Sequence, residues 1–470
     1  MRRTDSARDG RLAALVGVVL FAAYVAAQRG RVLSFDGTIM VDVATRLLAK
    51  HTFTLAPPLI ATLHLPSRYT SYGFGTTLLA LPFDAVQRAV RPAGASILTL
   101  ANPTVLAASG SVLFLIGRRL GWRRWVCVAT AFGFGLLTPA LWQSTEMFSE
   151  PGVTLASLAI VLGLLVWTDR PLAGPALVGV GIAAAVLFRP DSLVLVVPLV
   201  FAAPFLIPRR QLTTRAAVLW CGVPVAVVGV FELWYNQHRF GSIFSTGIQQ
   251  QAAGRGFDTP ILQGLDLLLR SPGRGFFWTA PVLLIALPGF VWLYRRNAPI
   301  TIAIAAVVVA RFLFFAHWWT PGGGVAWGPR LLFPATALLA LPAGEAVERA
   351  ATWQSARDRG FAWGAIGALA GVGAVVSVLS ISVAYELYWR VWTSGVAKPF
   401  RPARVHAYYW SLRHNPIAGD IHLLRAGPRI APIHFRHSPD LVGVLALVVC
   451  VAGAVAAFVY ARPPRDSGAV

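Results

Sequence analysis

Seven short polar stretches interrupt an otherwise apolar sequence, and they carry the side chains that could do chemistry. They read SFDG at 34–37, RYTSYGFGTTLLALPF at 68–83, TEMFSEP at 145–151, FRPDS at 188–192, YNQHRFGS at 235–242, SPGRGFF at 271–277 and GGGVAWGPRLLFP at 322–334. Carboxylates can accept protons, and an arginine guanidinium matches a phosphate through two parallel hydrogen bonds. These residue types therefore suit proton transfer and the binding of an anion.

Asp36 is the most informative of these residues because it follows directly on the first apolar run, where the chain leaves the lipid. After it, Ile39, Met40, Val43 and Leu47 share one face at helical spacing, which predicts a short amphipathic helix in the membrane interface. Asp36 would sit at the N-cap of this helix, and an aspartate there is often only a cap that accepts backbone N–H bonds. A role as a cap and a role in proton transfer do not exclude each other, since a capping position also fixes the carboxylate in place.

Composition places the chain among integral membrane proteins. Hydrophobic residues make up 56% and charged residues 13% of the 470 positions, whereas roughly 25% charged residues are typical of soluble domains. We do not expect the first apolar run to be a cleaved signal sequence, since no small-residue cleavage site follows it and further runs do. We therefore expect an all-α polytopic membrane protein that forms a single integral membrane domain over residues 1–470.

Twelve apolar runs are candidate membrane spans, each close to the length needed to cross ~30 Å of hydrocarbon. They cover 12–28, 97–117, 125–143, 149–168, 173–189, 191–208, 216–235, 276–294, 299–316, 329–345, 361–383 and 440–460. The segment 72–86 is also apolar but short, where ~20 residues are needed to span. We expect it to lie at the outer surface.

Arginine clusters decide the topology. They are Arg2/Arg3/Arg8, Arg118/Arg119/Arg123/Arg124, Arg209/Arg210/Arg215, Arg295/Arg296, Arg349/Arg357/Arg359 and Arg462/Arg465. With twelve spans all six lie on one side, which short basic loops identify as the cytoplasm, so both termini are expected inside. The outer face then carries 29–96, 236–275 and 385–439. The last segment holds Lys398 and seven arginines, which weigh little because long loops translocate regardless of charge.

Arg330 breaks this charge bias, because it begins an apolar run on the expected outer side. A phosphate carried there by a lipid would suit its guanidinium. Arg274 lies in a Gly/Pro loop ahead of another run on the same side. We expect the chemistry on the outer face of the inner (cytoplasmic) membrane, in a multi-pass protein.

Several other polar residues have simple structural explanations. Tyr72 and Trp327 suit the aromatic belt at a membrane interface, and His317 suits a hydrogen-bonded structural role. Arg189 and Asp191 predict a local ion pair in a tight turn. As substrate-binding candidates we retain Arg68, Tyr69, Tyr72, Glu150, Asp191, His317 and Trp327.

Composition also excludes some partners and sites. Cys127, Cys221 and Cys450 lie inside apolar runs and fit neither a disulfide framework nor a zinc site. The net charge of +22 comes from arginines spread between spans, without a nucleic-acid-binding motif around them. Membrane lipids with anionic headgroups are the expected partners instead of nucleic acid.

Taken together, in this order and on the expected outer side, the polar stretches resemble those of the GT-C superfamily of membrane glycosyltransferases. Within this superfamily, the stretches resemble those of the protein O-mannosyltransferases, the lipid A aminoarabinose transferases and many bacterial proteins. The similarity runs from about residue 12 to the last span. It implies a fold of about 12 transmembrane helices, with interface helices in the first outer loop.

Such enzymes take a sugar from a polyprenyl-phosphate carrier and pass it to an acceptor outside the cytoplasmic membrane. The resemblance implies that Asp36 is the catalytic base, since a hydroxyl acceptor must lose a proton as it attacks the anomeric carbon. Arg330 and Arg274 are then candidates to bind the donor phosphate. Many relatives carry two adjacent acids, whereas Phe35 and Gly37 flank a single aspartate here. We therefore expect no metal and no other cofactor.

Two other classes of protein stay open. A lipid or solute transporter or flippase would be expected to show discontinuous helices, charges near the bilayer midplane and internal repeats. Here Arg311 and Glu232 lie near the ends of spans, and no repeat is evident. A non-catalytic relative that only binds lipid-linked sugars is the other alternative. The sequence does not identify the sugar, and it does not show whether the acceptor is a glycan, a lipid or a protein.

Overall fold

The chain is helical throughout the part that the computed structural model describes. The described residues are 3–90, 95–248, 255–385, 409–413, 415–427, 431–436 and 439–462. Each of the three predicted outer segments is therefore described only in part, and Lys398 lies outside the described residues. No strand occurs within these ranges. The prediction of an all-α protein is confirmed.

Each predicted span coincides with a helix or with a helix preceded or followed by a shorter one. The main helices are α1 Arg3–Ala26, α5 Ala101–Arg119, α6 Arg124–Leu136, α8 Glu150–Val166, α9 Ala173–Phe188, α10 Leu193–Phe201, α13 Arg215–Phe240, α17 Ala286–Arg296, α18 Ala298–His317, α19 Phe333–Ala350, α20 Ala356–Ser382 and α24 Leu441–Ala461. Among the described residues, seven helical segments are long and apolar enough to cross a membrane, and several apolar helices are shorter. The chain is a polytopic membrane protein, and twelve crossings remain a prediction.

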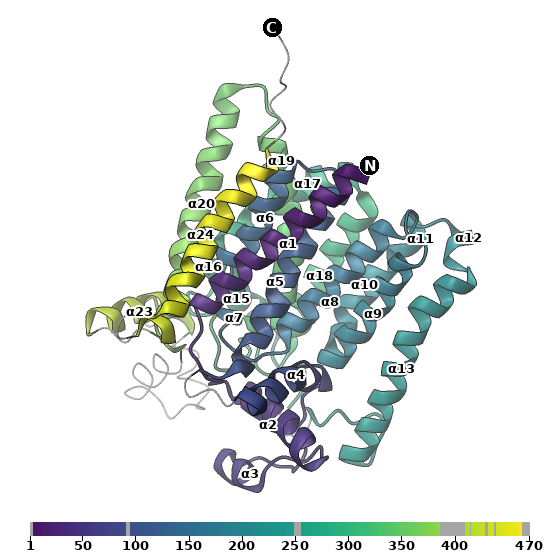
Figure 1. Cartoon of the computed structure of the whole chain (residues 1–470), viewed down its shortest axis with the longest axis vertical. Coiled ribbons are helices and arrows are strands. Elements are labelled where there is room, and N and C mark those ends of the chain that lie inside the picture. Colours follow the sequence, from purple (N-terminus) through teal and green to yellow (C-terminus); the bar gives the residue numbers. More distant parts are fainter. Residues whose placement is uncertain are drawn as a thin grey trace.

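The helices differ in how much of their surface other helices cover. Leu338 and Leu341 of α19 are fully buried in the core of the bundle. By contrast, α13 and α24 present apolar side chains outward, with Val227 and Val451 each more than half exposed. Figure 1 shows α13 at the edge of the bundle. Apolar side chains exposed in this way suit contact with lipid tails.

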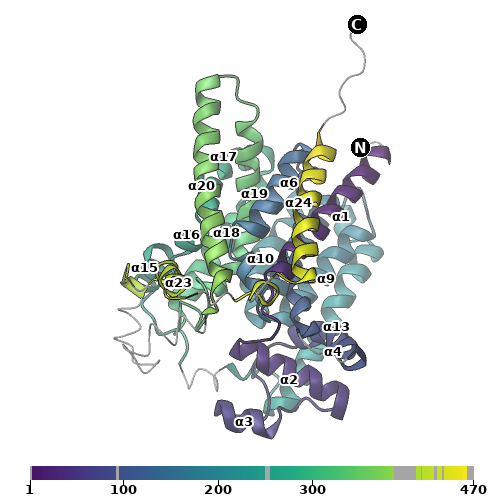
Figure 2. The same ribbon diagram turned by 60° about the vertical axis from the view of Figure 1, so that its left-hand side comes forward.

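The short basic loops meet at one end of the bundle. There Asp9 of α1 pairs with Arg118 at 3.0 Å and with Arg124 at 2.6 Å, and Arg296 pairs with Glu345 at 2.7 Å. The start of α1 and the end of α24 lie at this same end (Figures 1 and 2). The prediction that these loops share one side agrees with the structure. That this side is the cytoplasm remains a prediction.

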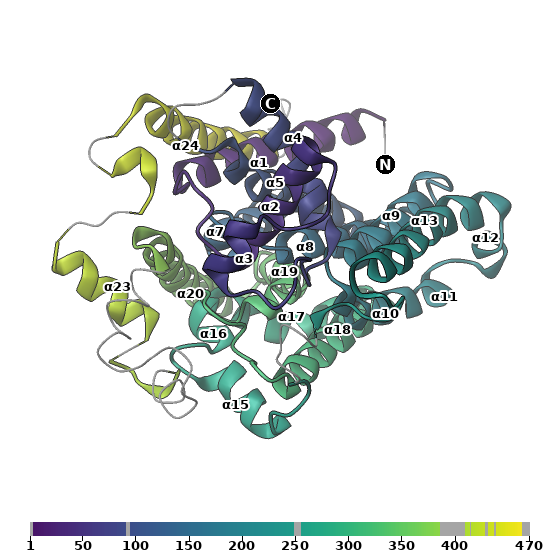
Figure 3. The same ribbon diagram turned by 90° about the horizontal axis from the view of Figure 1, so that it is seen from below.

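The opposite end is covered by α2 Phe35–Lys50, α3 Pro57–Leu63 and α4 Phe74–Val90 (Figure 3). The expected amphipathic helix is α2, and the protein itself covers much of its apolar face. Ala44 packs with Ala80 of α4, while Ile39 and Val43 pack with Leu55. The short apolar segment 72–86 falls largely within α4, which lies beside α2 at this end of the bundle (Figure 3).

Two glycines bring the start of α4 against the end of α9. A Cβ atom on Gly73 would lie 2.4 Å from the carbonyl oxygen of Phe188, and one on Gly75 would lie 2.7 Å from the Phe188 Cα. Only glycine allows so close an approach. The RYTSYGFG and FRPDS stretches therefore meet in space, which brings Tyr72 and Arg189 into one region.

Candidate active site

Asp36 lies in the first turn of α2 and not at its cap. The N-cap is Ser34, whose backbone N–H donates to the Glu146 carboxylate at 3.0 Å. The prediction that Asp36 caps the helix is therefore wrong by two residues. The reason is a contact distant in sequence: Glu146 is held by Arg29 at 2.7 Å, with both side chains buried, and this pair fixes where α2 begins.

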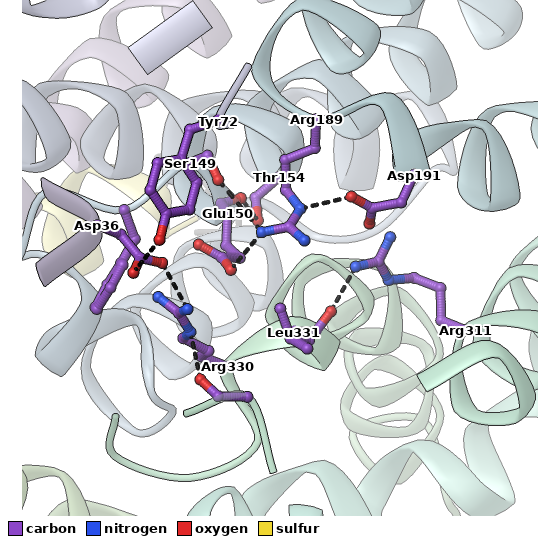
Figure 4. A network of polar contacts seen from close by, with 12 residues as sticks. Asp36, Tyr72, Ser149, Glu150, Thr154, Arg189, Asp191, Arg311, Arg330 and Leu331 are labelled. Atoms are coloured by element: carbon purple, nitrogen blue, oxygen red, sulfur yellow. Dashed lines mark hydrogen bonds and ion pairs between the residues drawn. The ribbon is translucent and has the colours of Figure 1, made fainter. Parts of the chain in front are cut away.

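The two carboxylate oxygens of Asp36 have different partners (Figure 4). Oδ1 accepts a hydrogen bond from the Tyr72 hydroxyl at 2.6 Å, and Oδ2 forms an ion pair with Arg330 at 2.6 Å. The side chains of Asp36 and Arg330 are each 13% exposed, so the pair is shielded but still reached by solvent. The structure thus brings together three of the predicted residues from three distant segments.

Arg330 is held in place by the glycine-rich loop that precedes it. Its Nε donates to the Gly323 carbonyl at 2.7 Å, and its guanidinium lies 4.5 Å from the centre of the Phe148 ring. Gly323 and Gly324 have φ angles of +75° and +74°, in the left-handed region that glycine adopts without strain. This loop therefore aims the guanidinium at Asp36.

A second charged cluster lies beside the first. Arg189 pairs with Asp191 and with Glu150, both at 2.9 Å, and the Glu150 side chain is almost fully buried. The predicted local pair of Arg189 and Asp191 is present, and Glu150 extends it across to α8. Figure 4 shows this cluster next to Asp36 and Arg330.

Several buried polar atoms of this region have no hydrogen-bond partner among the described residues. They are Oε2 of Glu150, Oδ2 of Asp191, and Nε and Nη1 of Arg311. Arg311, from α18, also donates to the carbonyl of Leu331, the residue after Arg330 (Figure 4). Because buried charged groups need partners, this region is suited to hold polar ligand atoms or water.

Arg274 contacts the glycine-rich loop that leads to Arg330. It is fully buried and donates to the carbonyls of Gly324 at 2.6 Å, Gly328 at 2.9 Å and Ala326. These bonds hold the loop that presents Arg330. The geometry therefore gives Arg274 a role in shaping the loop, and its binding of the donor phosphate stays a prediction.

Tyr72 is positioned by a residue that sequence reasoning overlooked. Arg239, near the end of α13, donates to the carbonyls of Thr70 at 2.7 Å and Tyr72 at 3.1 Å. Its guanidinium also lies 3.7 Å from the centre of the Tyr235 ring. The stretch YNQHRFGS carried the signal, since it places an arginine at the outer end of a span. Arg29 was overlooked in the same way, and so was the pairing of Arg189 with Glu150.

The other candidates lie around the site or outside it. Tyr69 lines a cavity next to Tyr72, and the Arg68 guanidinium lies 5.1 Å from the centre of the Tyr69 ring. Trp327 is buried beside Arg330, where both line a small void. His317 is not brought to Asp36 by any contact in the described residues; its Nδ1 is 2.6 Å from the Thr259 carbonyl oxygen.

Part of the predicted outer segment 385–439 lies close enough to Arg29 for their charges to interact. Asp420 of α23, Pro416–Arg425, is buried. Burial raises the pKa of the Asp420 carboxyl well above its ordinary value, and the positive charge of Arg29 opposes that rise.

Among the described residues, no three His, Cys, Asp or Glu side chains are grouped closely enough to hold a metal ion.

No protein-family model and no curated protein match the sequence. The structure is similar to the crystal structure of ArnT from Cupriavidus metallidurans bound to undecaprenyl phosphate, with a TM-score of 0.52. The two sequences are 14% identical, and the match covers 96% of this chain and 76% of that chain. The chain has the GT-C fold.

A weaker likeness, with a TM-score of 0.46 and 14% identity, is to the archaeal oligosaccharyltransferase AglB from Archaeoglobus fulgidus in complex with an inhibitory peptide and a dolichol-phosphate. It covers 85% of this chain and 59% of that chain. The GT-C fold expected from the polar stretches is confirmed by the likeness to ArnT. At 14% identity that likeness establishes the fold, and the roles of Asp36 and Arg330 rest on their own geometry.

Proposed function

We propose that this protein is a glycosyltransferase that takes a sugar from a polyprenyl-phosphate donor and passes it to a hydroxyl acceptor on the outer side of the cytoplasmic membrane. One observation carries the proposal: a carboxylate and a guanidinium meet, partly shielded from water, at the end of a GT-C bundle. The ArnT structure holds undecaprenyl phosphate, which supports a lipid phosphate as part of the donor.

The two charged groups suit the two ends of a glycosyl transfer. The acceptor O–H would give its proton to Asp36 while its oxygen bonds to the anomeric carbon. The bond between that carbon and the phosphate oxygen breaks, and its electron pair stays with the phosphate. Arg330 would stabilise the charge that develops there through its planar N–H donors. Glu150 and Asp191 lie beside this pair and are proposed to contact the sugar.

The experiment is a transfer assay with the full chain in lipid nanodiscs. A panel of polyprenyl-phosphate hexoses and pentoses is supplied with a mixed extract of envelope glycans, and released polyprenyl phosphate is measured. Release that depends on both the acceptor and Asp36 supports the proposal. Movement of the lipid-linked sugar across proteoliposomes without any release would instead favour a flippase, and binding without either would favour a non-catalytic relative.

A further inference from the structure

A cavity of about 320 Å³ lies next to Asp36, at the end of the bundle covered by α2–α4. Tyr72 connects the two, because it lines the cavity and its hydroxyl donates to Oδ1 of Asp36 at 2.6 Å. The volume lies at the lower end of the ~300–1,000 Å³ found for small-molecule sites. Only the Tyr72 side chain would then lie between a small ligand in the cavity and the Asp36 carboxylate.

The lining combines aromatic rings with hydroxyl groups. The aromatic lining residues are Phe35, Tyr69, Tyr72, Phe240 and Trp319. Ser67 and Thr70, whose side chains carry hydroxyls, are lining residues as well. A sugar ring has an apolar C–H face and a rim of hydroxyls, so it matches a site that offers flat apolar surfaces beside a few polar groups.

The two hydroxyls of the lining keep hydrogen-bonding capacity for a ligand. Ser67 Oγ accepts from the Tyr69 N–H at 3.0 Å, and Thr70 Oγ1 accepts from the Tyr72 N–H at 3.1 Å. A hydroxyl has one donor and two acceptor positions, so each can still donate to a ligand oxygen. A hydrocarbon tail would leave these donors without a partner, which disfavours a prenyl chain as the occupant.

Charge narrows the class of ligand further. None of the described residues that line the cavity is Asp, Glu, Lys or Arg, although the chain has 41 lysines and arginines, and His64 is the one histidine among these lining residues. Phosphate and carboxylate groups are normally recognised by such basic side chains. The charged groups closest to the lining contact protein groups: Arg239 donates to the carbonyls of Thr70 and Tyr72, the Arg68 guanidinium lies 5.1 Å from the centre of the Tyr69 ring, and Asp36 accepts from the Tyr72 hydroxyl. The cavity therefore selects for an uncharged ligand.

We propose that this cavity binds the acceptor, and that the acceptor is an uncharged saccharide. The assignment of this ligand as the acceptor rests on the proposed function. Arg330 faces Oδ2 of Asp36 and the cavity adjoins the side of Oδ1, so the leaving phosphate and the entering hydroxyl would be on opposite sides of the base. The hydroxyl that loses its proton to Asp36 is a sugar hydroxyl, and its oxygen forms the new glycosidic bond.

The test measures saccharide binding to the full chain in nanodiscs by saturation-transfer difference NMR. The probes are the methyl glycosides of glucose, galactose, mannose and N-acetylglucosamine, with glucose 6-phosphate and glucuronate as charged counterparts. At least one neutral glycoside should bind, with a Kd about tenfold or more below that of the charged sugars. Equal or tighter binding of the charged sugars, or no binding of any neutral glycoside, overturns the inference.

Variants locate the binding within the molecule. Trp319→Ala and Tyr69→Ala should each weaken neutral glycoside binding roughly tenfold, because each removes an aromatic surface. Trp318→Ala is the matched control, since the Trp318 ring packs on Phe257 at 5.2 Å and does not line the cavity. Equal effects of Trp319→Ala and Trp318→Ala would place the bound glycoside elsewhere and overturn the inference.

Competition separates the acceptor from the donor. Undecaprenyl phosphate should not displace the glycoside, because its phosphate is expected at Arg330. Displacement by undecaprenyl phosphate, or by a polyprenyl-phosphate glucose alone, would assign the cavity to the donor and overturn the inference. If sugar transfer occurs only to anionic acceptors, the inference fails while the proposed function stands. If neutral glycosides bind as described but no transfer occurs, the proposed function fails and the cavity remains a saccharide site.

Discussion

The Asp36 carboxylate and the Arg330 guanidinium form an ion pair at 2.6 Å, although one residue begins the helix after α1 and the other leads into α19. A donor phosphate that bound Arg330 would compete with Asp36 for the same N–H groups. Once the guanidinium turns to the phosphate, Oδ2 of Asp36 would be free to accept a hydrogen bond from an acceptor hydroxyl. Binding of the donor would in this way prepare Asp36 to act as a base.

The first prediction is that Asp36→Asn abolishes sugar transfer while the protein still folds. An asparagine cannot take up the proton, and loss of a general base costs about 10²–10⁴-fold in rate. Folding should survive because Ser34, and not Asp36, is the N-cap of α2. The measurement is the transfer rate from a polyprenyl-phosphate sugar, together with the thermal unfolding temperature.

Asp42→Asn is the control, since Asp42 lies on the same helix and accepts from the Ala56 N–H at 2.8 Å without contacting Arg330. It should keep transfer near the wild-type rate. Near wild-type turnover in Asp36→Asn would remove Asp36 from the chemistry.

The second prediction concerns the affinity of Arg330 for the lipid phosphate. Arg330→Lys keeps the charge but loses the planar pair of donors, so binding of undecaprenyl phosphate should weaken roughly tenfold. Arg88→Lys should leave binding unchanged, since the Arg88 side chain is 41% exposed and pairs with Asp84 within α4. Isothermal titration in nanodiscs measures both variants. Unchanged affinity in Arg330→Ala would exclude Arg330 from the phosphate site.

The third prediction separates a structural Arg274 from a phosphate ligand. Arg274→Met leaves the carbonyls of Gly324, Ala326 and Gly328 without these donors. Each lost partner costs about 1–3 kcal/mol, so the unfolding temperature should fall clearly. Arg270→Met is the control, because Arg270 ends the preceding helix, α15 (Ile261–Arg270), and its side chain is 76% exposed. Equal unfolding temperatures, with loss of undecaprenyl phosphate binding only in Arg274→Met, would instead make Arg274 a ligand.

The sequence predicted the helices well because bilayer thickness fixes the length of an apolar run. Asp36 and Arg330 could also be found, since a charge beside an apolar run stands out. Their pairing could not, because it depends on how distant segments pack. Arg274 and Arg330 look alike in sequence, yet one is turned into the loop and the other toward Asp36. Backbone conformation at glycines such as Gly323 decides that direction.

The fourth prediction tests the side of the membrane on which the site lies. Single cysteines at Pro66 and Val90, both exposed at the end of the bundle covered by α2–α4, should react with an impermeant maleimide on intact cells. A cysteine at Gln354, exposed between α19 and α20, should react only after the cells are opened. The background lacks Cys127, Cys221 and Cys450. Labelling of position 90 only in opened cells would contradict the expected topology.

The fifth prediction is that Glu150 and Arg189 depend strongly on each other. Removing one partner of a buried ion pair leaves an uncompensated charge, which typically costs 3–5 kcal/mol. Arg189→Met should therefore destabilise the protein strongly, because the Glu150 side chain is only 1% exposed. The double variant Glu150→Gln, Arg189→Met should be more stable than Arg189→Met alone, since the buried negative charge is gone. Thermal unfolding of the wild type, both single variants and the double variant gives the coupling energy, expected at about 0.5–3 kcal/mol.

Arg119→Met with Asp169→Asn supplies the comparison, because the Asp169 side chain is 65% exposed and that pair should show almost no coupling. Strictly additive effects at Glu150 and Arg189 would mean that the cluster beside Asp36 is not held together by this pair.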